Sequence, residues 1–361
     1  MTITVSARRI WVLVGFALAS VSASVVAADP PASSDPALTP AESKVLSNLR
    51  QVTKGFTRAG EGYFSPDGKQ ICYQAYPLGY PFYQIYVQPV DQFAPRRISF
   101  GRGRTTCSYF SPDGKQILFA SAHTDPDIDQ TEFQARELEK QGPKRRYLWD
   151  FDPNMEIYVS DINGLNTRRL TDSPGYDAEG SFSHDGKQIV FTSSRSGDAE
   201  IYVMAADGSN VRRLTNAKGY DGGPFFSPDD QWIIFRSDRQ KEHMLQLFAI
   251  SADGQHETPL TSNLDQVNWC PYFHPSGKYL VWSGADYARG PMSANFDLFT
   301  AEIAQTATTF AISDIKQITD HEKADVLPVF SPDGRQLMWT SSRTADGSSQ
   351  LWIADWQREM K

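Results

Sequence analysis

The stretch Phe110-Ser111-Pro112-Asp113-Gly114, an aromatic residue followed by a tight-turn sequence, occurs in related form six times along the chain. Proline presets one turn dihedral and glycine tolerates a positive φ, so each copy predicts a hairpin between two antiparallel strands. The other copies are Phe64-Ser65-Pro66-Asp67-Gly68, Phe182-Ser183-His184-Asp185-Gly186, Phe226-Ser227-Pro228-Asp229-Asp230, Phe273-His274-Pro275-Ser276-Gly277 and Phe330-Ser331-Pro332-Asp333-Gly334. This internal repeat decides the fold.

Two further strand patterns follow the hairpins. Third strands are predicted at 84–87, 156–159, 200–203, 246–249, 297–300 and 350–353, and fourth strands at 96–99, 168–171, 212–215, 258–261 and 316–319. That leaves the sixth unit without a fourth strand, and the segment from Asn48 to Thr53, which precedes the first hairpin, matches the missing pattern. The sequence therefore predicts an all-β fold, a six-bladed β-propeller of four-stranded blades, closed by an N-terminal strand that completes the last blade.

Composition is consistent with a globular domain that buries its own core, with 361 residues, of which 40% are hydrophobic and 22% charged. A formal net charge of -8 argues against nucleic acid as a partner, because phosphate neutralisation needs a basic face. The one strongly basic run, Lys144-Arg145-Arg146, is interpreted as a solvated loop. Three cysteines, Cys72, Cys107 and Cys270, do not make a disulfide framework. Cys107 and Cys270, each three residues before its repeat's Phe on an innermost strand, are interpreted as small core residues.

The N-terminus resembles an export signal. Arg8-Arg9 precede an apolar stretch from Ile10 to Ala19, and Val26-Ala27-Ala28 fit a cleavage site, so residues 1–28 are predicted to be a signal peptide and the location periplasmic. The arginine pair leaves the choice between the Sec and twin-arginine routes open. No second apolar stretch reaches the roughly 18 to 20 residues that a membrane span requires.

The segment after the predicted cleavage site is rich in proline and serine. Residues 29–40 are interpreted as a tether and residues 41–361 as the propeller. Thr39 as N-cap, Pro40 at the first helical position and Glu42 as the returning acid fit a capping box, which predicts a short helix to about Ser47.

The hairpins, the Glu-Ile-Tyr-Val strand and the passage Asp207-Gly-Ser-Asn-Val-Arg-Arg-Leu-Thr215 resemble the TolB-type propeller repeat, also called the PD40 repeat. The resemblance covers nearly everything from Asn48 to the end of the chain. It implies the fold much more strongly than the function, because related propellers occur in TolB, the tricorn protease, prolyl oligopeptidase-like peptidases and oligogalacturonate lyases. TolB itself carries an α/β domain before the propeller, and about twenty residues precede the first strand here after the predicted cleavage. The resemblance therefore implies the propeller architecture and does not imply a role in the Tol envelope system.

Charged residues recur at the face of the ring opposite the hairpin turns, here called the mouth face. The residues five before and thirteen after each repeat's Phe are expected to be cross-strand neighbours. They pair Asp177 with Arg195, Asp221 with Arg239, and Asp325 with Arg343. Structural ion pairs are one interpretation, and a ring of charges that receives a polar ligand is the other. The remaining blades have Ala59 and Pro77, Thr105 and His123, and Asn268 and Asp286 at these places.

Blade two carries an insertion from about His123 to Met155, which is long for such a loop. Asp129 as N-cap and Glu132 three residues later predict a helix to about Gln141, in a position to form a lid beside the mouth. Asp125, Asp127 and Asp129 alternate as in a calcium loop, but Gln130 replaces the required Gly and Arg136 the closing Glu. No cofactor is therefore predicted, and calcium at these aspartates is the alternative. No other metal is predicted.

The sequence contains no Gly-x-Ser-x-Gly elbow and no close histidine pair of the His-Glu-x-x-His type. We expect a binding or scaffolding module that acts through the mouth face on an envelope protein or a small polar ligand. The aromatic loop from Tyr76 to Tyr83 is a candidate contact surface for a protein partner. A lyase-like enzyme acting on oligosaccharides is the alternative, with His123, Arg195 and Arg239 as its candidate residues.

Overall fold

The repeated turn sequences form the predicted hairpins in the computed structural model, which describes residues 37–140, 151–290 and 294–357. In the first repeat, Ser65 Oγ donates to Asp67 Oδ1 at 2.6 Å, and the Gly68 amide donates to the Ser65 carbonyl at 2.8 Å, with Gly68 at φ 70°. Ser65 Oγ also accepts the Gln70 amide at 2.9 Å. Serine and aspartate thus fix the turn that glycine permits. The predicted signal peptide, most of the tether and the basic run Lys144-Arg145-Arg146 lie outside the described residues.

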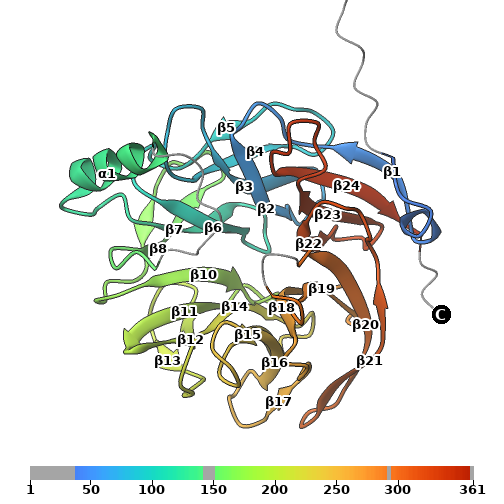
Figure 1. Cartoon of the computed structure of the whole chain (residues 1–361). Coiled ribbons are helices and arrows are strands. Elements are labelled where there is room, and N and C mark those ends of the chain that lie inside the picture. Colours follow the sequence, from blue (N-terminus) through green and yellow to red (C-terminus); the bar gives the residue numbers. More distant parts are fainter. Residues whose placement is uncertain (1–36, 141–150, 291–293, 358–361) are drawn as a thin grey trace, which may run out of the picture. The chain divides into compact units, whose positions relative to one another are not determined.

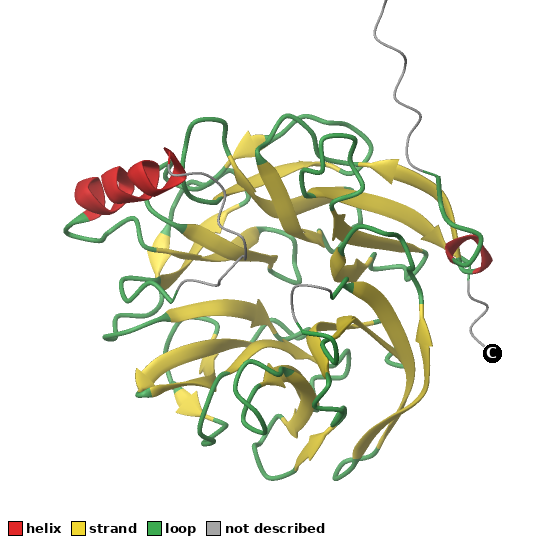
Figure 2. Ribbon diagram, viewed as in Figure 1, coloured by secondary structure: helices red, strands yellow, loops and turns green. Residues whose placement is uncertain are grey.

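The strands form six antiparallel sheets of four strands each, arranged around a common axis (Figures 1 and 2). From the innermost strand outward, the blades are as follows: β2 (Arg58–Phe64), β3 (Gln70–Tyr76), β4 (Gln84–Pro89) and β5 (Arg96–Arg97); β6 (Thr105–Phe110), β7 (Gln116–Ser121), β8 (Glu156–Asp161) and β9 (Arg168–Arg169); β10 (Asp177–Phe182), β11 (Gln188–Ser196), β12 (Asp198–Ala205) and β13 (Arg212–Arg213); β14 (Asp221–Phe226), β15 (Trp232–Ser237), β16 (Gln246–Ser251) and β17 (Glu257–Pro259); β18 (Gln266–Phe273), β19 (Tyr279–Asp286), β20 (Asp297–Gln305) and β21 (Phe310–Gln317); β22 (Asp325–Phe330), β23 (Gln336–Ser341), β24 (Gln350–Trp356) and β1 (Leu46–Gln51). The six-bladed fold is confirmed.

Ring closure follows the prediction. Strand β1 pairs antiparallel with β24, with Leu46 opposite Trp356 and Gln51 opposite Trp352, so the first strand in sequence is the outer strand of the last blade. It lies two residues earlier than expected. The capping box is present, since the Glu42 amide donates to Thr39 Oγ1 at 3.1 Å and the Thr39 amide to Glu42 Oε2 at 2.9 Å. The expected helix to Ser47 was wrong: only a 3₁₀ turn, Glu42–Lys44, forms, because the chain must already be extended at Leu46 to pair with β24.

The core lies between neighbouring sheets. Side chains of β11 and β12, such as Val190 and Ile201, pack with those of β14 and β15, such as Phe226 and Ile233. Each innermost strand also contacts the innermost strands of both neighbouring blades. This packing makes a rigid support on which mouth-face loops are held in fixed relative positions.

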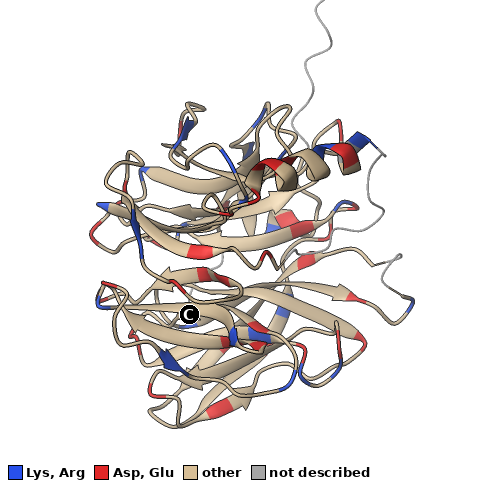
Figure 3. Cartoon of the chain, turned by 90° about the vertical axis from the view of Figure 1, so that its left-hand side faces the viewer, with Lys and Arg blue, Asp and Glu red and all other residues tan. Residues whose placement is uncertain are grey.

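The insertion in blade two contains the predicted helix, α1, at Ile128–Lys140. Asp129 lies in its first turn rather than at the N-cap, and the entry is organised by Asp125, whose carboxylate accepts the Asp127 amide at 2.9 Å and Thr131 Oγ1 at 2.9 Å. Acidic and basic residues are interspersed along α1 and the neighbouring loops (Figure 3). No helix among the described residues is long and apolar enough to cross a membrane.

Candidate functional site at the mouth face

The three predicted charge pairs all form ion pairs. Arg195 Nη2 lies 2.7 Å from Asp177 Oδ2, and the corresponding distances are 2.5 Å for Arg239 and Asp221 and 2.6 Å for Arg343 and Asp325. The expected backbone register was wrong by two residues, because Asp177 is opposite Ser193 rather than Arg195. A β-bulge in the innermost strand absorbs one residue and the turn is shorter than assumed, so the long arginine side chain spans the remaining distance.

A serine completes each of these Asp–Ser–Arg clusters. Arg195 Nε donates to Ser193 Oγ at 2.8 Å, and Ser193 Oγ in turn donates to Asp177 Oδ1 at 2.5 Å. Ser237 and Ser341 accept the other two arginines in the same way, at 2.9 and 3.0 Å. The guanidinium groups also lie over aromatic rings of their own blades. Because every charge has a partner inside its own blade, the clusters fix the ends of the strands. A direct role of these aspartates and arginines in ligand binding stays a prediction.

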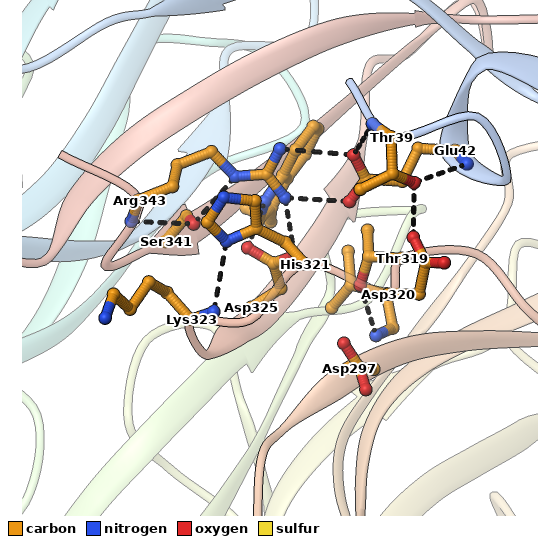
Figure 4. A network of polar contacts seen from close by, with 12 residues as sticks. Thr39, Glu42, Asp297, Thr319, Asp320, His321, Lys323, Asp325, Ser341 and Arg343 are labelled. Atoms are coloured by element: carbon orange, nitrogen blue, oxygen red, sulfur yellow. Dashed lines mark hydrogen bonds and ion pairs between the residues drawn. The ribbon is translucent and has the colours of Figure 1, made fainter. Parts of the chain in front are cut away.

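Arg343 is the most enclosed of the three arginines. Its side chain is fully buried, and its Nη2 donates to Asp325 at 2.6 Å and to Glu42 Oε1 at 3.0 Å (Figure 4). Glu42 belongs to the N-terminal turn, so this ion pair joins residues 301 positions apart in the chain. Thr39 Oγ1 adds a hydrogen bond to Asp320. The sequence prediction of an Asp325–Arg343 pair is thus confirmed, and its third member, Glu42, was missed.

His123 occupies the arginine position in blade two. Its ring stacks on Phe100 at 3.6 Å between centroids and lies 4.7 Å from the Tyr158 ring, and Nδ1 is 3.1 Å from Ser121 Oγ. Burial, together with the positive charge of Arg169, lowers the pKa of His123 to about 4, so the imidazole is neutral at pH 7. His123 interacts within blade two, whereas Arg195 and Arg239 are held by their own carboxylates. The structure does not bring the three proposed lyase residues together.

Six residues, one from each innermost strand, line the axis, and the sequence interpretation singled out only the two cysteines among them. We call them the axial ring: Glu61, Cys107, Glu179, Gly223, Cys270 and Leu327, each three residues before the repeat's Phe. All six have φ between 48° and 59°, and each lies at the β-bulge of its strand. Left-handed non-glycine residues and bulges are uncommon and concentrate at functional sites. Cys107 and Cys270 are both buried, at 5% and 7% exposure, which confirms their interpretation as small buried residues.

Side chains from the preceding blade stabilise this unusual backbone. The Glu61 amide donates to Thr340 Oγ1 at 3.2 Å, the Cys107 amide to Gln74 Oε1 at 3.1 Å, and the Leu327 amide to Ser283 Oγ at 2.9 Å. Each acceptor lies ten residues after its own repeat's Phe. A hydrogen-bonding residue at this position, on a strand that is otherwise apolar, is the sequence signal that could have revealed the ring.

Arg236 occupies the same position in blade four and sends a positive charge to the axis instead. Its Nη2 donates to Glu179 Oε1 at 3.1 Å and to the Tyr220 hydroxyl at 2.7 Å, and its Nη1 is 3.6 Å from Cys270 Sγ. Gly223 makes this possible, since a Cβ there would lie 2.2 Å from Arg236 Nη1. The glycine of the ring thus gives the guanidinium its space.

Glu179 is fully engaged, whereas Glu61 is not. Glu179 accepts hydrogen bonds from Tyr220 at 2.7 Å and from the Gly223 amide at 2.6 Å, besides its ion pair with Arg236. Glu61 has Cys107 Sγ at 3.9 Å from its carboxylate. Burial, reinforced by the negative charge of Glu179 and only partly offset by Arg236, raises the pKa of Glu61 to about 7.

Aromatic residues close the axis toward the hairpin turns. Tyr63, Tyr109, Phe225 and Tyr272 contact one another with ring centroids 5.0 to 6.1 Å apart, and the hydroxyls of Tyr109 and Tyr272 lie 3.2 Å apart across the ring. We call these four residues the aromatic layer. Beyond it lies a hollow of about 320 Å³ lined by prolines and phenylalanines of the turns. The polar axial ring is therefore separated from the hairpin face and faces the mouth.

The insertion contributes to the mouth mainly through the residues that follow its helix. Phe151, nearly half exposed, packs on Tyr176 and Tyr220 with centroids 5.1 and 5.6 Å away, and Asp152 forms an ion pair with Arg104 at 2.6 Å. Helix α1 itself lies at the outside of the ring (Figure 1) and is attached through Glu132, which accepts the Tyr80 hydroxyl at 2.6 Å. The helix is not a lid over the axis.

Comparison with known proteins supports the repeat type. Residues 151–288 match the family model of the tricorn protease N-terminal β-propeller domain. A stretch of 43 residues is 56% identical to the Tol-Pal system protein TolB of Bordetella pertussis and of Bordetella bronchiseptica. It covers 12% of this chain and 10% of each relative, so the match spans about a tenth of the length of those proteins.

Solved structures share the fold at low identity. TolB from Acinetobacter baumannii superposes with a TM-score of 0.54 at 20% identity, over 84% of this chain and 65% of that protein. A putative TolB from Agrobacterium tumefaciens gives 0.53 at 17%, over 87% and 98%. An oligogalacturonate lyase in complex with manganese gives 0.53 at 13%, over 86% and 94%. With its repeats, its ring closure and these matches, the chain is a TolB-like six-bladed β-propeller with repeats of the PD40 type.

Proposed function

We propose that this protein is an exported periplasmic binding module that holds a polar ligand, or a polar segment of an envelope protein, at the mouth face over the axial ring. One observation carries the proposal: charged side chains on the axis remain partly exposed although the aromatic layer closes the other end. Glu61 keeps intermediate exposure and the Arg236 side chain is 13% exposed. A concave polar site on a rigid ring is the usual form of a ligand site.

The axial ring is suited to recognition by charge. Glu61, Glu179 and Arg236 carry a net charge of about -1 when Glu61 is ionised and about zero when it is protonated. Phe151 and Tyr220 provide aromatic surface beside these charges. A ligand with a hydrogen-bond donor or a positive group aimed at Glu61 would complete the set of partners that Glu179 already has.

A binding role is favoured over the lyase-like alternative. A lyase would need a free base or cation near the substrate, but Arg195 and Arg239 are neutralised within their own blades. The likeness to oligogalacturonate lyase is one of fold at 13% identity and carries no catalytic residue to this chain.

The location rests on the sequence of residues 1–28 and is tested by cell fractionation. The full chain is expected in the periplasmic fraction and lacking its leader, whereas a chain with Arg8 and Arg9 changed to Asn and the apolar stretch interrupted by charges is expected to stay in the cytoplasm. Cytoplasmic recovery of the unchanged protein would contradict the proposal.

The binding proposal is tested by a thermal-shift screen against divalent metals, oligosaccharides and short peptides. A ligand present at 100 times its Kd stabilises the folded state by about 2.7 kcal/mol, which raises Tm by several degrees. A shift that falls when Glu61 is changed to Gln, with the exposed Glu242→Gln variant as control, supports binding over the axial ring. A shift unaffected by Glu61→Gln and by Phe151→Ala would contradict this location.

A further inference from the structure

A cavity of about 770 Å³ opens in the mouth face of blade five. Its lining includes the strand residues Asn268, Gly284, Asp286, Asp297 and Phe299. Asn268, Gly284 and Asp286 hold the positions of the Asp–Ser–Arg clusters of blades three, four and six, and Phe299 holds the position of an aromatic ring. We call the cavity the blade-five pocket.

In the sister blades, an arginine of the chain itself fills the corresponding space. The guanidinium carbon of Arg195 lies 5.4 and 5.2 Å from the ring centroids of Phe191 and Tyr202. That of Arg239 lies 5.5 and 4.7 Å from Phe235 and Phe248. In blades three and four, the corresponding space therefore holds a guanidinium group, which stacks on aromatic rings and pairs with a carboxylate.

Blade five keeps the aromatic rings but has lost the arginine. Trp282 and Phe299 remain stacked, with centroids 6.0 Å apart and an interplanar angle of 23°. The arginine position holds Asp286, the serine position Gly284 and the aspartate position Asn268. Phe299 is accordingly more exposed than its counterparts Tyr202 and Phe248, which are 6% and 4% exposed.

The pocket also contains a carboxylate, that of Asp297, at a position where a carboxylate of blade three has an arginine partner. Asp297 occupies the position of Glu200, which is bound by Arg213 at 2.5 Å and Thr215 at 2.6 Å. Asp297 has weaker neutral partners, with Gln317 Nε2 at 3.2 Å and Asn295 Nδ2 at 3.5 Å.

Charges surround Asp297 on several sides. The pKa of Asp297 is raised to about 7, first by burial and then by the negative charges of Asp325, Asp320 and Glu42. The positive charge of Arg343 opposes this shift (Figure 4). Asp286 is exposed at the entrance and accepts the Ala288 amide at 2.8 Å. Arg289, the basic residue among those lining the pocket, is exposed at its rim.

We propose that the blade-five pocket binds a guanidinium group from outside, namely an arginine side chain of a peptide segment, in the space that Arg195 and Arg239 fill in their own blades. Phe299 supplies the aromatic face, and Asp286 and Asp297 supply the carboxylates. The volume of the pocket also accommodates residues that flank the arginine. The inference rests on the proposed binding role of the mouth face and assigns it a ligand class at a second place, away from the axial ring.

Calorimetry with Nα-acetyl-arginine amide tests the inference on the full processed protein. The matched citrulline derivative has the same shape without the charge, and the lysine derivative has the charge without the planar group. We expect the arginine derivative to bind at least tenfold more tightly than either. Equal affinity for arginine and citrulline, or no binding of the arginine derivative, would overturn the proposal.

Two variants connect the binding to the pocket. Asp286→Arg restores the arginine of the sister blades and should abolish binding by filling the pocket from within, whereas Asp286→Asn should weaken binding severalfold. Arg239→Ala vacates the site in blade four and should create a new site for the same probe. Circular dichroism and Tm establish that each variant is folded. Full binding by a folded Asp286→Arg variant would overturn the assignment.

Binding of a short peptide identifies the source of the guanidinium. The blocked peptide Gly-Arg-Gly should bind at least as tightly as acetyl-arginine amide if the pocket takes an arginine within a chain. Exclusion of the peptide would assign the pocket to a small guanidinium compound and overturn the peptide source. The axial ring is tested separately, by the thermal-shift screen with Glu61→Gln, so a failure of the pocket and a failure of the axial ring give different results.

Discussion

The pH dependence of stability offers a quantitative test of the axial ring. Burial next to Glu179 raises the pKa of Glu61 from 4.5 to about 7, so between these pH values the folded state holds a proton that the unfolded chain releases. The stability that the protonated group contributes is present below pH 4.5 and is lost as the pH rises through 7. At about 1.4 kcal/mol for each pH unit, the loss is about 3 kcal/mol at most, because the side chain retains some contact with solvent.

Glu61→Gln removes this ionisation while keeping the shape of the protonated side chain. We expect its free energy of unfolding to equal that of the unchanged protein at pH 4.5 and to exceed it by about 2 to 3 kcal/mol at pH 8. Urea unfolding followed by circular dichroism at both pH values measures the difference, with exposed Glu242→Gln as the control. If the difference in unfolding free energy between the two proteins stays constant from pH 4.5 to pH 8, the assignment of a buried carboxyl with a raised pKa at the axis is refuted.

Three further perturbations test how the ring is held together. Arg343→Met leaves two buried carboxylates without a cation and should cost about 3 to 5 kcal/mol in urea unfolding; the more exposed Arg239→Met should cost less, and equal costs would contradict the importance of Glu42. Gly223→Ala places a methyl group against Arg236 at a φ of 59° and should lower Tm by several degrees; an unchanged Tm would show that the guanidinium does not need this space. A chain that starts after β1 leaves β24 as an open edge and should associate in size-exclusion chromatography at concentrations where the full chain does not.

The repeats allowed most of the fold to be predicted, because each local signal agreed with the ring. Proline and glycine in the turns located the hairpins, and the missing fourth strand located the closure by β1. Helix α1 was expected at 129–141 and is found at Ile128–Lys140. The hairpins depend on short-range chemistry that is visible in any single copy of the repeat, whereas the closure by β1 required all six copies to be compared.

The candidate site was less predictable, because it depends on residues that meet only in the closed ring. The bulge that turns Glu61 and Glu179 toward the axis carries glycine only at Gly223, so the usual signal of a left-handed residue is absent from the other five positions. The partnership of Glu42 with Arg343 joins the two ends of the chain. The unusual pair Asn268 and Asp286 was visible in the sequence, but the cavity between them follows from the packing of Phe299.

The central claim, that the mouth face is the binding face, is tested most directly by labelling in the cell envelope. The native cysteines are at most 7% exposed, so a maleimide reports on one introduced cysteine at a time. Ser262→Cys lies at the mouth face beside the blade-five pocket, and Lys115→Cys lies at a hairpin turn. Compared with purified protein, labelling in the envelope should slow at position 262 and stay unchanged at position 115. Protection at 115 with free labelling at 262 would contradict the account.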